Sequence, residues 1–245
     1  MKVDDNVSNE AGLEEVAQAI RLNHKLPLAG QLYDALKQAI VTLRLMPGVM
    51  ISESSICNST GMSRTPVKSA ISRLNEDGLI EMLPQRGSFV SLISLGSVRS
   101  SHFIRRSLEV ALLKEAAKNW DQKKSAQARE ILQTQLSAIA SGNEDGFHEA
   151  DIRFHQMFAT FADRAACTET IEVMRGKLIR FYRLFGKPER LAIVVKEHTA
   201  IIDALDTGNI ELAEKHLVNH IDKAFVVIKS LPETYGPYLT DESKD

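Results

Sequence analysis

The sequence predicts a mainly α-helical protein, with an N-terminal winged helix-turn-helix that carries a small β-hairpin wing and a C-terminal all-α helical bundle. Three observations support this fold class. Residues 53–78 contain two helical patterns separated by a glycine-containing turn, which is the signature of a helix-turn-helix. Residues 79–91 contain two β-prone runs around Pro84-Gln85-Arg86-Gly87 and predict a hairpin. Residues 100–230 show only the helical period.

The segment before the helix-turn-helix divides into an irregular part and one helix. Residues 1–25 show no clear pattern and are expected to be a flexible extension, in which residues 13–22 form at most a transient helix. Gln31–Leu45 is predicted to be the first stable helix, and Pro47-Gly48 ends it. Its inward-facing side chains would be Leu32, Leu36, Ile40 and Leu43.

The helix-turn-helix itself has clear boundary signals. Glu53–Thr60 is predicted to be its first helix, and Gly61-Met62 forms the turn. Ser63 is a good N-cap for the second helix, because its hydroxyl can accept a hydrogen bond from the first turn. Gly78 stands where a left-handed residue would end that helix. The apolar stripe of the second helix is Val67, Ala70, Ile71 and Leu74.

Polar and basic residues gather where such a fold contacts DNA. Arg64, Thr65 and Lys68 lie at the start of the second helix, off its apolar stripe, where a recognition helix contacts bases. At the hairpin tip Arg86 stands beside Gly87, so the backbone can approach a phosphate or a minor groove. The alternative is a helical hairpin capped by a β-turn that contacts no DNA. The candidate DNA-binding residues are Ser63, Arg64, Thr65, Pro66, Lys68, Arg73, Arg86 and Gly87.

The net charge of −2 is distributed unevenly along the chain. Residues 1–24 and 233–245 each carry −3, whereas residues 25–91 and 92–232 each carry +2. Affinity for DNA depends on the cations that face phosphate, so the negative total does not exclude DNA binding. Because +2 is modest, we expect weak non-specific binding, with affinity drawn from a homodimer that grips two half-sites.

Length and composition are those of a globular protein. The 245 residues are enough for two domains, and 25% of them are charged and 44% hydrophobic. No apolar run approaches the roughly 18 residues of a membrane span, and the start of the chain lacks signal-peptide features. Cys57 and Cys167 fall in different predicted domains, with no disulfide framework or zinc-finger spacing. We therefore expect a cytoplasmic protein without a membrane partner.

The winged helix-turn-helix is expected to occupy residues 26–91 and the helical domain residues 100–232. Residues 92–99 would form a linker and residues 233–245 a flexible tail. The second domain should be a bundle of amphipathic helices. The predicted helices are Ser100–Trp120, Lys124–Ser141, Gly146–Thr160, Cys167–Phe185, Arg190–Asp206 and Ile210–Ser230.

Six of the seven histidines fall in the helical domain. Asp151 and His155 are four residues apart, hence on one face of a helix. The short turn between the last two helices makes them antiparallel, which places His198 and His220 at nearly the same height. These four residues form a plausible nitrogen and oxygen site for a divalent metal. His216 is a competing ligand, and the alternative is a set of unrelated helix histidines.

Residues 30–91 resemble the winged-helix domain of the GntR family of bacterial transcription regulators. The resemblance is carried by Pro47-Gly48, Gly61-Met62-Ser63-Arg64-Thr65-Pro66-Val67-Lys68, Leu74, Gly78-Leu79-Ile80 and Arg86-Gly87. It implies that Arg64 and Lys68 contact bases or phosphates and that Arg86-Gly87 enters the minor groove. The family usually has Arg-Glu where this chain has Lys68-Ser69. Because lysine cannot make arginine's bidentate fork to guanine, the operator can differ from a typical one.

Residues 100–230 resemble the FCD domain, the all-helical effector domain of the FadR subfamily of GntR regulators. The matching pieces are Ile104-Arg105-Arg106-Ser107-Leu108-Glu109, Ala150-Asp151-Ile152-Arg153-Phe154-His155 and Glu197-His198 followed by His220. This resemblance implies that the aspartate and the three histidines hold a metal, most often zinc or nickel, although manganese also suits these ligands. It further implies a small organic acid as effector. Arg105 could pair with that acid or instead with Glu109, and Tyr182 is a further candidate pocket residue.

The sequence therefore predicts a transcription regulator that binds a double-stranded, pseudo-palindromic operator as a homodimer. A small carboxylic acid at the metal site would control operator binding. In an alternative reading the metal ion is itself the signal. A metal-dependent enzyme is less favoured, because no glutamate is evidently placed as a general base and the H-E-x-x-H pattern is missing. No catalytic residue is assigned.

Overall fold

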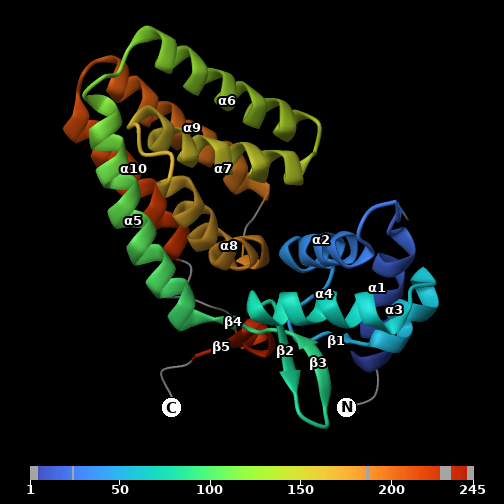
Figure 1. Cartoon of the computed structure of the whole chain (residues 1–245). Coiled ribbons are helices and arrows are strands. Elements are labelled where there is room, and N and C mark those ends of the chain that lie inside the picture. Colours follow the sequence, from blue (N-terminus) through green and yellow to red (C-terminus); the bar gives the residue numbers. More distant parts are fainter. Residues whose placement is uncertain (1–4, 24, 186–187, 227–232, 242–245) are drawn as a thin grey trace. The chain divides into compact units, whose positions relative to one another are not determined.

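The computed structural model describes residues 5–23, 25–185, 188–226 and 233–241. The chain forms two compact units, residues 1–95 with 232–245 and residues 96–231. Short strands occur in the first unit and helices make up the second, so the predicted fold class is confirmed (Figure 1). No helix in the described ranges is long and apolar enough to cross a membrane.

The first unit packs helices against a small sheet. Its helices are α1 (Asp5–Ala19), α2 (Leu28–Val41), α3 (Glu53–Thr60) and α4 (Arg64–Glu76), and the sheet strands are β1 (Met50–Ile51), β2 (Ile80–Leu83) and β3 (Gly87–Val90). Leu36, Ile40, Ile56, Val67 and Leu74 are fully buried in a single core. The predicted inward residues Leu32, Leu36 and Ile40 of α2 therefore meet the apolar stripe of α4 there, and Ile56 of α3 closes the core. Leu43, also predicted to face inward, lies beyond the end of α2 and is only partly buried.

The boundaries of α3 and α4 follow the capping signals with one exception, whereas α2 ends at Val41, four residues before the predicted end at Leu45. The Ser52 hydroxyl accepts a hydrogen bond from the Ser55 amide at 3.1 Å, which starts α3. Gly61 and Gly78 both have a φ of +70°, the left-handed conformation that ends α3 and α4. Ser63 does occupy the N-cap position of α4, but its side chain makes no capping hydrogen bond, so that detail of the prediction is wrong.

The wing is an antiparallel hairpin of β2 and β3 in which Ile80 pairs with Val90 and Leu83 with Gly87. Its tip turns through Gln85, with φ +61°, and Gly87, with φ +110°. The third strand, β1, pairs with β3 on the other side and was not predicted, because two residues carry no readable periodicity. Because Leu83 pairs with Gly87, residues 84–86 form the turn and Arg86 lies at the tip of the wing.

The predicted flexible extension at residues 1–25 is wrong for the described residues, because the chain is helical from Asp5 to Ala19. Leu13, Val16 and Ala17, spaced three and four residues apart, are buried in the core of the first unit. The Ser55 hydroxyl also donates to Glu14 Oε1 at 3.4 Å. This short apolar stripe is stabilised by α3, a tertiary contact that local propensity does not reveal.

The predicted linker and tail also contain regular structure. Within residues 92–99, β4 (Ile93–Ser94) precedes α5 (Leu95–Ala117), which begins five residues earlier than expected. Within residues 233–245, a 3-10 helix (Glu233–Tyr238) leads to β5 (Leu239–Thr240). β4 and β5 pair in parallel, so the described part of the tail is held by a partner far away in the sequence.

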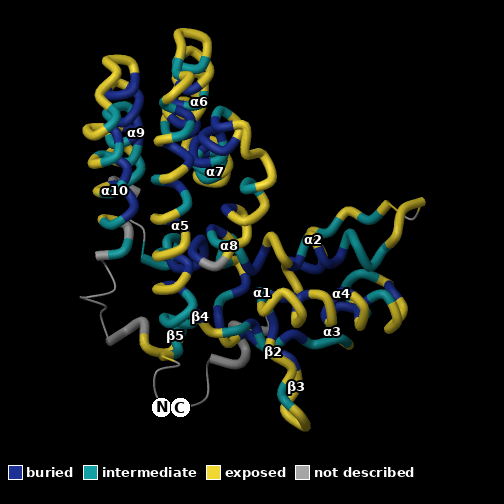
Figure 2. Tube along the Cα trace, turned by 60° about the vertical axis from the view of Figure 1, so that its left-hand side comes forward, coloured by how far each residue is buried: buried dark blue, intermediate teal, exposed yellow. Residues whose placement is uncertain are grey.

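The second unit is the predicted bundle. After α5 come α6 (Gln122–Ala140), α7 (Glu144–Phe161), α8 (Cys167–Phe185), α9 (Pro188–Asp206) and α10 (Ile210–Val226). Residues 227–230, the predicted end of the last helix, lie outside the described residues. Buried residues recur along the helices of the bundle, as the dark segments of the backbone tube in Figure 2 show. Phe154, Phe158, Ile201, Leu217 and Ile221 form the centre of this core.

Candidate metal centre and DNA-binding surface

Three histidines from three helices meet inside the bundle. His155 comes from α7, His198 from α9 and His220 from α10, and all three are buried. His220 Nε2 lies 3.3 Å from both His155 Nε2 and His198 Nε2. The ring of Phe154 stacks on His198 with 3.8 Å between centroids, which fixes the plane of that imidazole. The antiparallel α9–α10 pair thus brings the two predicted histidines to the same height.

Asp151 completes the cluster from one turn before His155. Its Oδ1 lies 3.8 Å from His155 Nε2 and 3.6 Å from His198 Nε2. This oxygen is buried and has no hydrogen-bond partner in the described part of the chain, while Oδ2 accepts from Arg175 Nη2. Burial alone would raise the pKa of Asp151, but Arg175 and the three imidazoles hold it well below the usual value. The group is therefore a carboxylate with one free oxygen facing three imidazoles.

Each histidine is held in place through its other ring nitrogen. His155 Nδ1 lies 2.6 Å from Glu109 Oε2, His198 Nδ1 lies 3.1 Å from Gln135 Oε1, and His220 Nδ1 lies 2.9 Å from Glu197 Oε2. Oxygen acceptors at these positions place the proton on Nδ1 and turn each Nε2 lone pair inward. Such outer partners are usual for metal-binding histidines.

The sequence analysis missed this outer layer in part. Glu109 was considered only as a partner of Arg105, and Glu197 only as part of a motif. Gln135 of α6 carried no signal at all, because nothing in one sequence fixes which face of α6 meets α9. The four-residue spacing identifies Glu109 as a carboxylate partner for Arg105, but it gives no sign that Glu109 also contacts His155.

The residues present fit a divalent metal. Bonds of about 2.0–2.2 Å place neighbouring donors about 3.0–3.5 Å apart in tetrahedral or octahedral geometry. The observed separations of 3.3–3.8 Å come close to that range. Burial lowers the pKa of His155 to about 4 and that of His198 well below its usual value, so both rings are neutral near pH 7, the form that binds metal. A cation would also satisfy the free oxygen of Asp151.

The other histidines of the bundle do not join the cluster. His216, the competing ligand, lies along a surface pocket of about 210 Å³ that Glu197 and His220 also line. His102 pairs instead with Asp222 at 3.1 Å and stacks on Phe225. Neither residue belongs to the group of His155, His198 and His220 that could hold an ion.

Arg105 borders the cluster and pairs with Glu109, one of the two partners that the sequence left open. Its Nε donates to Glu109 Oε1 at 2.5 Å, and its Nη2 lies 3.0 Å from His155 Nε2. Its Nη1 lies 3.5 Å from the hydroxyl of Tyr182, the second predicted effector residue. Burial opposes the charge, but Glu109 raises the pKa of Arg105 above its usual value, so the guanidinium stays positive.

The predicted DNA-binding residues fall into two groups. Ser63, Arg64, Thr65 and Lys68 are exposed at the start of α4, Pro66 is partly exposed there, and Arg86 and Gly87 are exposed at the wing tip. Arg73 differs, because its guanidinium lies 4.0 Å from the centre of the Tyr33 ring. It stands nine residues beyond Arg64, about 13 Å along the helix at 1.5 Å per residue.

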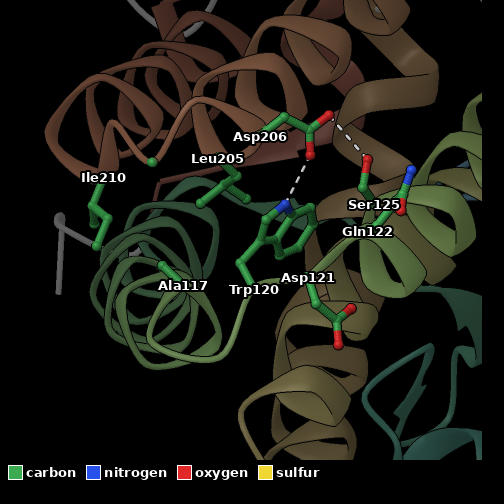
Figure 3. A pocket seen from close by; sticks show the side chains of 9 residues that line it. Ala117, Trp120, Asp121, Gln122, Ser125, Leu205, Asp206 and Ile210 are labelled. Carbon is green, nitrogen blue, oxygen red and sulfur yellow. Dashed lines mark hydrogen bonds between the residues drawn. The ribbon is translucent and has the colours of Figure 1, made fainter.

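A further pocket lies at the end of the bundle where the α5–α6 and α9–α10 turns meet. It has a volume of about 600 Å³ and is bordered by Trp120, whose indole Nε1 donates to Asp206 at 2.8 Å (Figure 3). Ser125 also donates to Asp206, at 2.9 Å. None of its lining residues belongs to the histidine cluster, and no sequence pattern predicted it.

A winged helix with an exposed, cation-bearing recognition helix, joined to a helical domain with a histidine cluster, defines a DNA-binding regulator of two domains. Comparisons with known proteins agree. Residues 28–90 match the bacterial regulatory proteins of the gntR family, and residues 101–223 match the FCD domain. The HTH-type transcriptional repressor RspR of Escherichia coli K12 is 30% identical over 223 residues, which cover 91% of this chain and 98% of that protein.

The chain therefore belongs to the GntR family and carries an FCD domain; it is a DNA-binding transcription regulator and not an enzyme. A probable D-xylose utilization operon transcriptional repressor of Paenarthrobacter nicotinovorans is 26% identical, covering 79% of this chain and 85% of that one. The crystal structure of a putative regulator GntR from Rhodococcus sp. RHA1 has the same fold. It superposes with a TM-score of 0.68 at 23% identity, over 83% of this chain and 99% of that one.

Proposed function

We propose that this regulator binds a divalent metal through Asp151, His155, His198 and His220 and responds to a small carboxylic acid at that metal. One observation carries the proposal: three inward Nε2 atoms and the free Oδ1 of Asp151 stand 3.3–3.8 Å from their neighbours. Imidazole with carboxylate suits zinc best, and nickel or manganese also fits. When bound, the ion would supply a Lewis-acidic centre for a carboxylate oxygen.

Arg105 supports a carboxylate as the ligand. A guanidinium 3.0 Å from His155 Nε2 would be repelled by a divalent ion, unless an anion lay between them. An acid held by the metal could accept hydrogen bonds from Arg105, and the Tyr182 hydroxyl stands next to that guanidinium. Arg105 and Tyr182 are therefore the proposed effector-binding residues.

We propose further that a homodimer presents two copies of α4 and the wing to a pseudo-palindromic operator. The exposed cations Arg64, Lys68 and Arg86 would contact DNA, and acid binding would change how the two winged helices are spaced. A coupling free energy of about 1–3 kcal/mol between effector binding and operator binding is typical of allosteric proteins.

In a second candidate function the metal is itself the signal. The observation in its favour is that His220, a proposed metal ligand, and its partner Glu197 also line the surface pocket next to His216. The metal site is therefore bordered by a pocket that opens to solvent. Metal exchange on the timescale of a response would need such access.

One experiment tests both versions. The operator is first recovered by selecting genomic fragments on the purified protein, and its affinity is then measured by fluorescence anisotropy with zinc-loaded and zinc-stripped protein. We expect a set of small carboxylic acids to change operator affinity only in the zinc-loaded form, and Asp151→Asn to bind less zinc and lose the response. A response that persists without zinc would contradict the metal-bound acid. A change of operator affinity with zinc alone would favour the metal as signal.

A further inference from the structure

Arg175 of α8 is a buried cation whose hydrogen-bonding capacity is mostly unused. Only 5% of its surface is exposed, and its Nη2 donates to Asp151 Oδ2. Its Nε and Nη1 are buried without a hydrogen-bond partner among the described residues. A charged donor left unsatisfied in the interior is costly, so a partner that binds there would be strongly favoured.

Arg175 adjoins the same cluster as Arg105. Both oxygens of Asp151 belong to one carboxylate, so the cation on Oδ2 stands beside the imidazoles that face Oδ1. Tyr182 stands two turns after Arg175 on the same face of α8 and approaches Arg105. The guanidinium of Arg175 also acts electrostatically on Glu109, Tyr182 and His155.

The charges of this buried set indicate what is missing. Arg105 and Arg175 contribute two positive charges and pair with Glu109 and Asp151, which contribute two negative ones. A divalent ion would raise the sum to +2 in a site shielded from water, where uncompensated charge is strongly unfavourable. A ligand with two negative charges, bound beside the ion, would offset the charge of that ion.

We infer that the effector is a dicarboxylate with a short spacer. One carboxylate binds the metal and Arg105, and the other binds the free nitrogens of Arg175. This inference rests on the proposed function and adds the chemical class of the ligand to it. The competing explanation is that Arg175 serves only to orient Asp151, for which its single bond from Nη2 is sufficient.

Calorimetry of the zinc-loaded, full-length protein with matched acids separates the two explanations. The pairs are malonate and propionate, succinate and butyrate, and glutarate and valerate, each of equal carbon number. We expect at least one dicarboxylate to bind about tenfold or more tightly than its partner, as a charge-assisted contact allows. Arg175→Gln should abolish this advantage, so that the ratio of dicarboxylate to monocarboxylate affinity falls to about one; because Arg175 also donates to the proposed ligand Asp151, zinc content is measured separately for this variant. Arg153→Gln, an exposed arginine on α7, is the matched control and should behave as wild type.

Each other outcome has a definite meaning. Equal binding of both members of every pair by the wild type overturns the second carboxylate and leaves the metal-bound acid standing. If no acid binds fully zinc-loaded protein, the proposed function and this inference fail together. If Arg175→Gln loses zinc and weakens both acids equally, Arg175 only orients Asp151. The wild-type comparison needs no variant, and Arg175→Lys, which keeps the charge and should retain part of the preference, serves if Arg175→Gln does not fold.

Discussion

The two regions proposed to bind ligands hold their arginines in opposite ways. On the winged helix, Arg64 and Arg86 are exposed at the start of α4 and at the wing tip. Inside the helical domain, Arg105 and Arg175 are at least 95% buried and paired with carboxylates. An exposed arginine can be replaced at little cost to the fold, whereas a buried one is part of the fold. The same residue type therefore predicts a loss of binding in one region and a loss of stability in the other.

The largest expected effect is on stability, in the helical domain. Glu109→Ala removes the carboxylate that pairs with Arg105 and orients His155, so a buried guanidinium is left without its partner. We expect the metal-free protein to lose about 3–5 kcal/mol of unfolding free energy, measured by urea denaturation. Glu149→Ala, an exposed glutamate on α7, is the control and should change stability by less than about 0.5 kcal/mol. Equal losses in the two variants would contradict the distinction between buried and exposed ionic groups on which the comparison rests.

The complementary test removes an exposed arginine. Arg64→Ala should weaken specific operator binding by about 1–3 kcal/mol for each half-site, because the side chain stands at the start of the recognition helix. Its melting temperature and zinc content should match those of the wild type. Anisotropy titrations against the selected operator and a scrambled duplex provide the measurement. Normal operator affinity in this variant would show that the start of α4 does not read the sequence.

The two regions also differ in how far the sequence predicts them. The helix-turn-helix is local: Ser52, Gly61 and Gly78 mark its helix ends within a few residues, so their positions could be read directly. Asp151 and the three histidines could be found because one pair shares a helix face and the other spans a short turn. Gln135 and Arg175 could not, since their roles depend on the rotation of α6 and α8 about their axes, which distant packing decides. The β4–β5 pair was missed for the same reason.

The pH dependence of stability provides a smaller effect in the helical domain. The pKa of His148 is lowered from 6.5 to about 4, mainly by burial and also by the nearby guanidinium of Arg183. Between these values the unfolded chain binds a proton that the folded one does not, so stability falls as pH falls from 6.5 towards 4. The contribution is at most about 1.4 kcal/mol per pH unit. Urea denaturation of His148→Gln across this range should show a shallower slope, whereas an unchanged slope would show that His148 is not held neutral.

The smallest expected effect sharpens the comparison within the winged helix itself. Arg73 is exposed like Arg64, but its guanidinium lies over the Tyr33 ring, whose hydroxyl bonds to Asp77. Replacing it with alanine should cost about 0.5–1 kcal/mol of unfolding free energy through the lost cation–π contact. Operator affinity should fall much less than in Arg64→Ala, since the side chain is committed to the fold about 13 Å further along α4. A loss of operator affinity as large as that of Arg64→Ala would place DNA along the whole length of α4 and restore Arg73 as a contact residue.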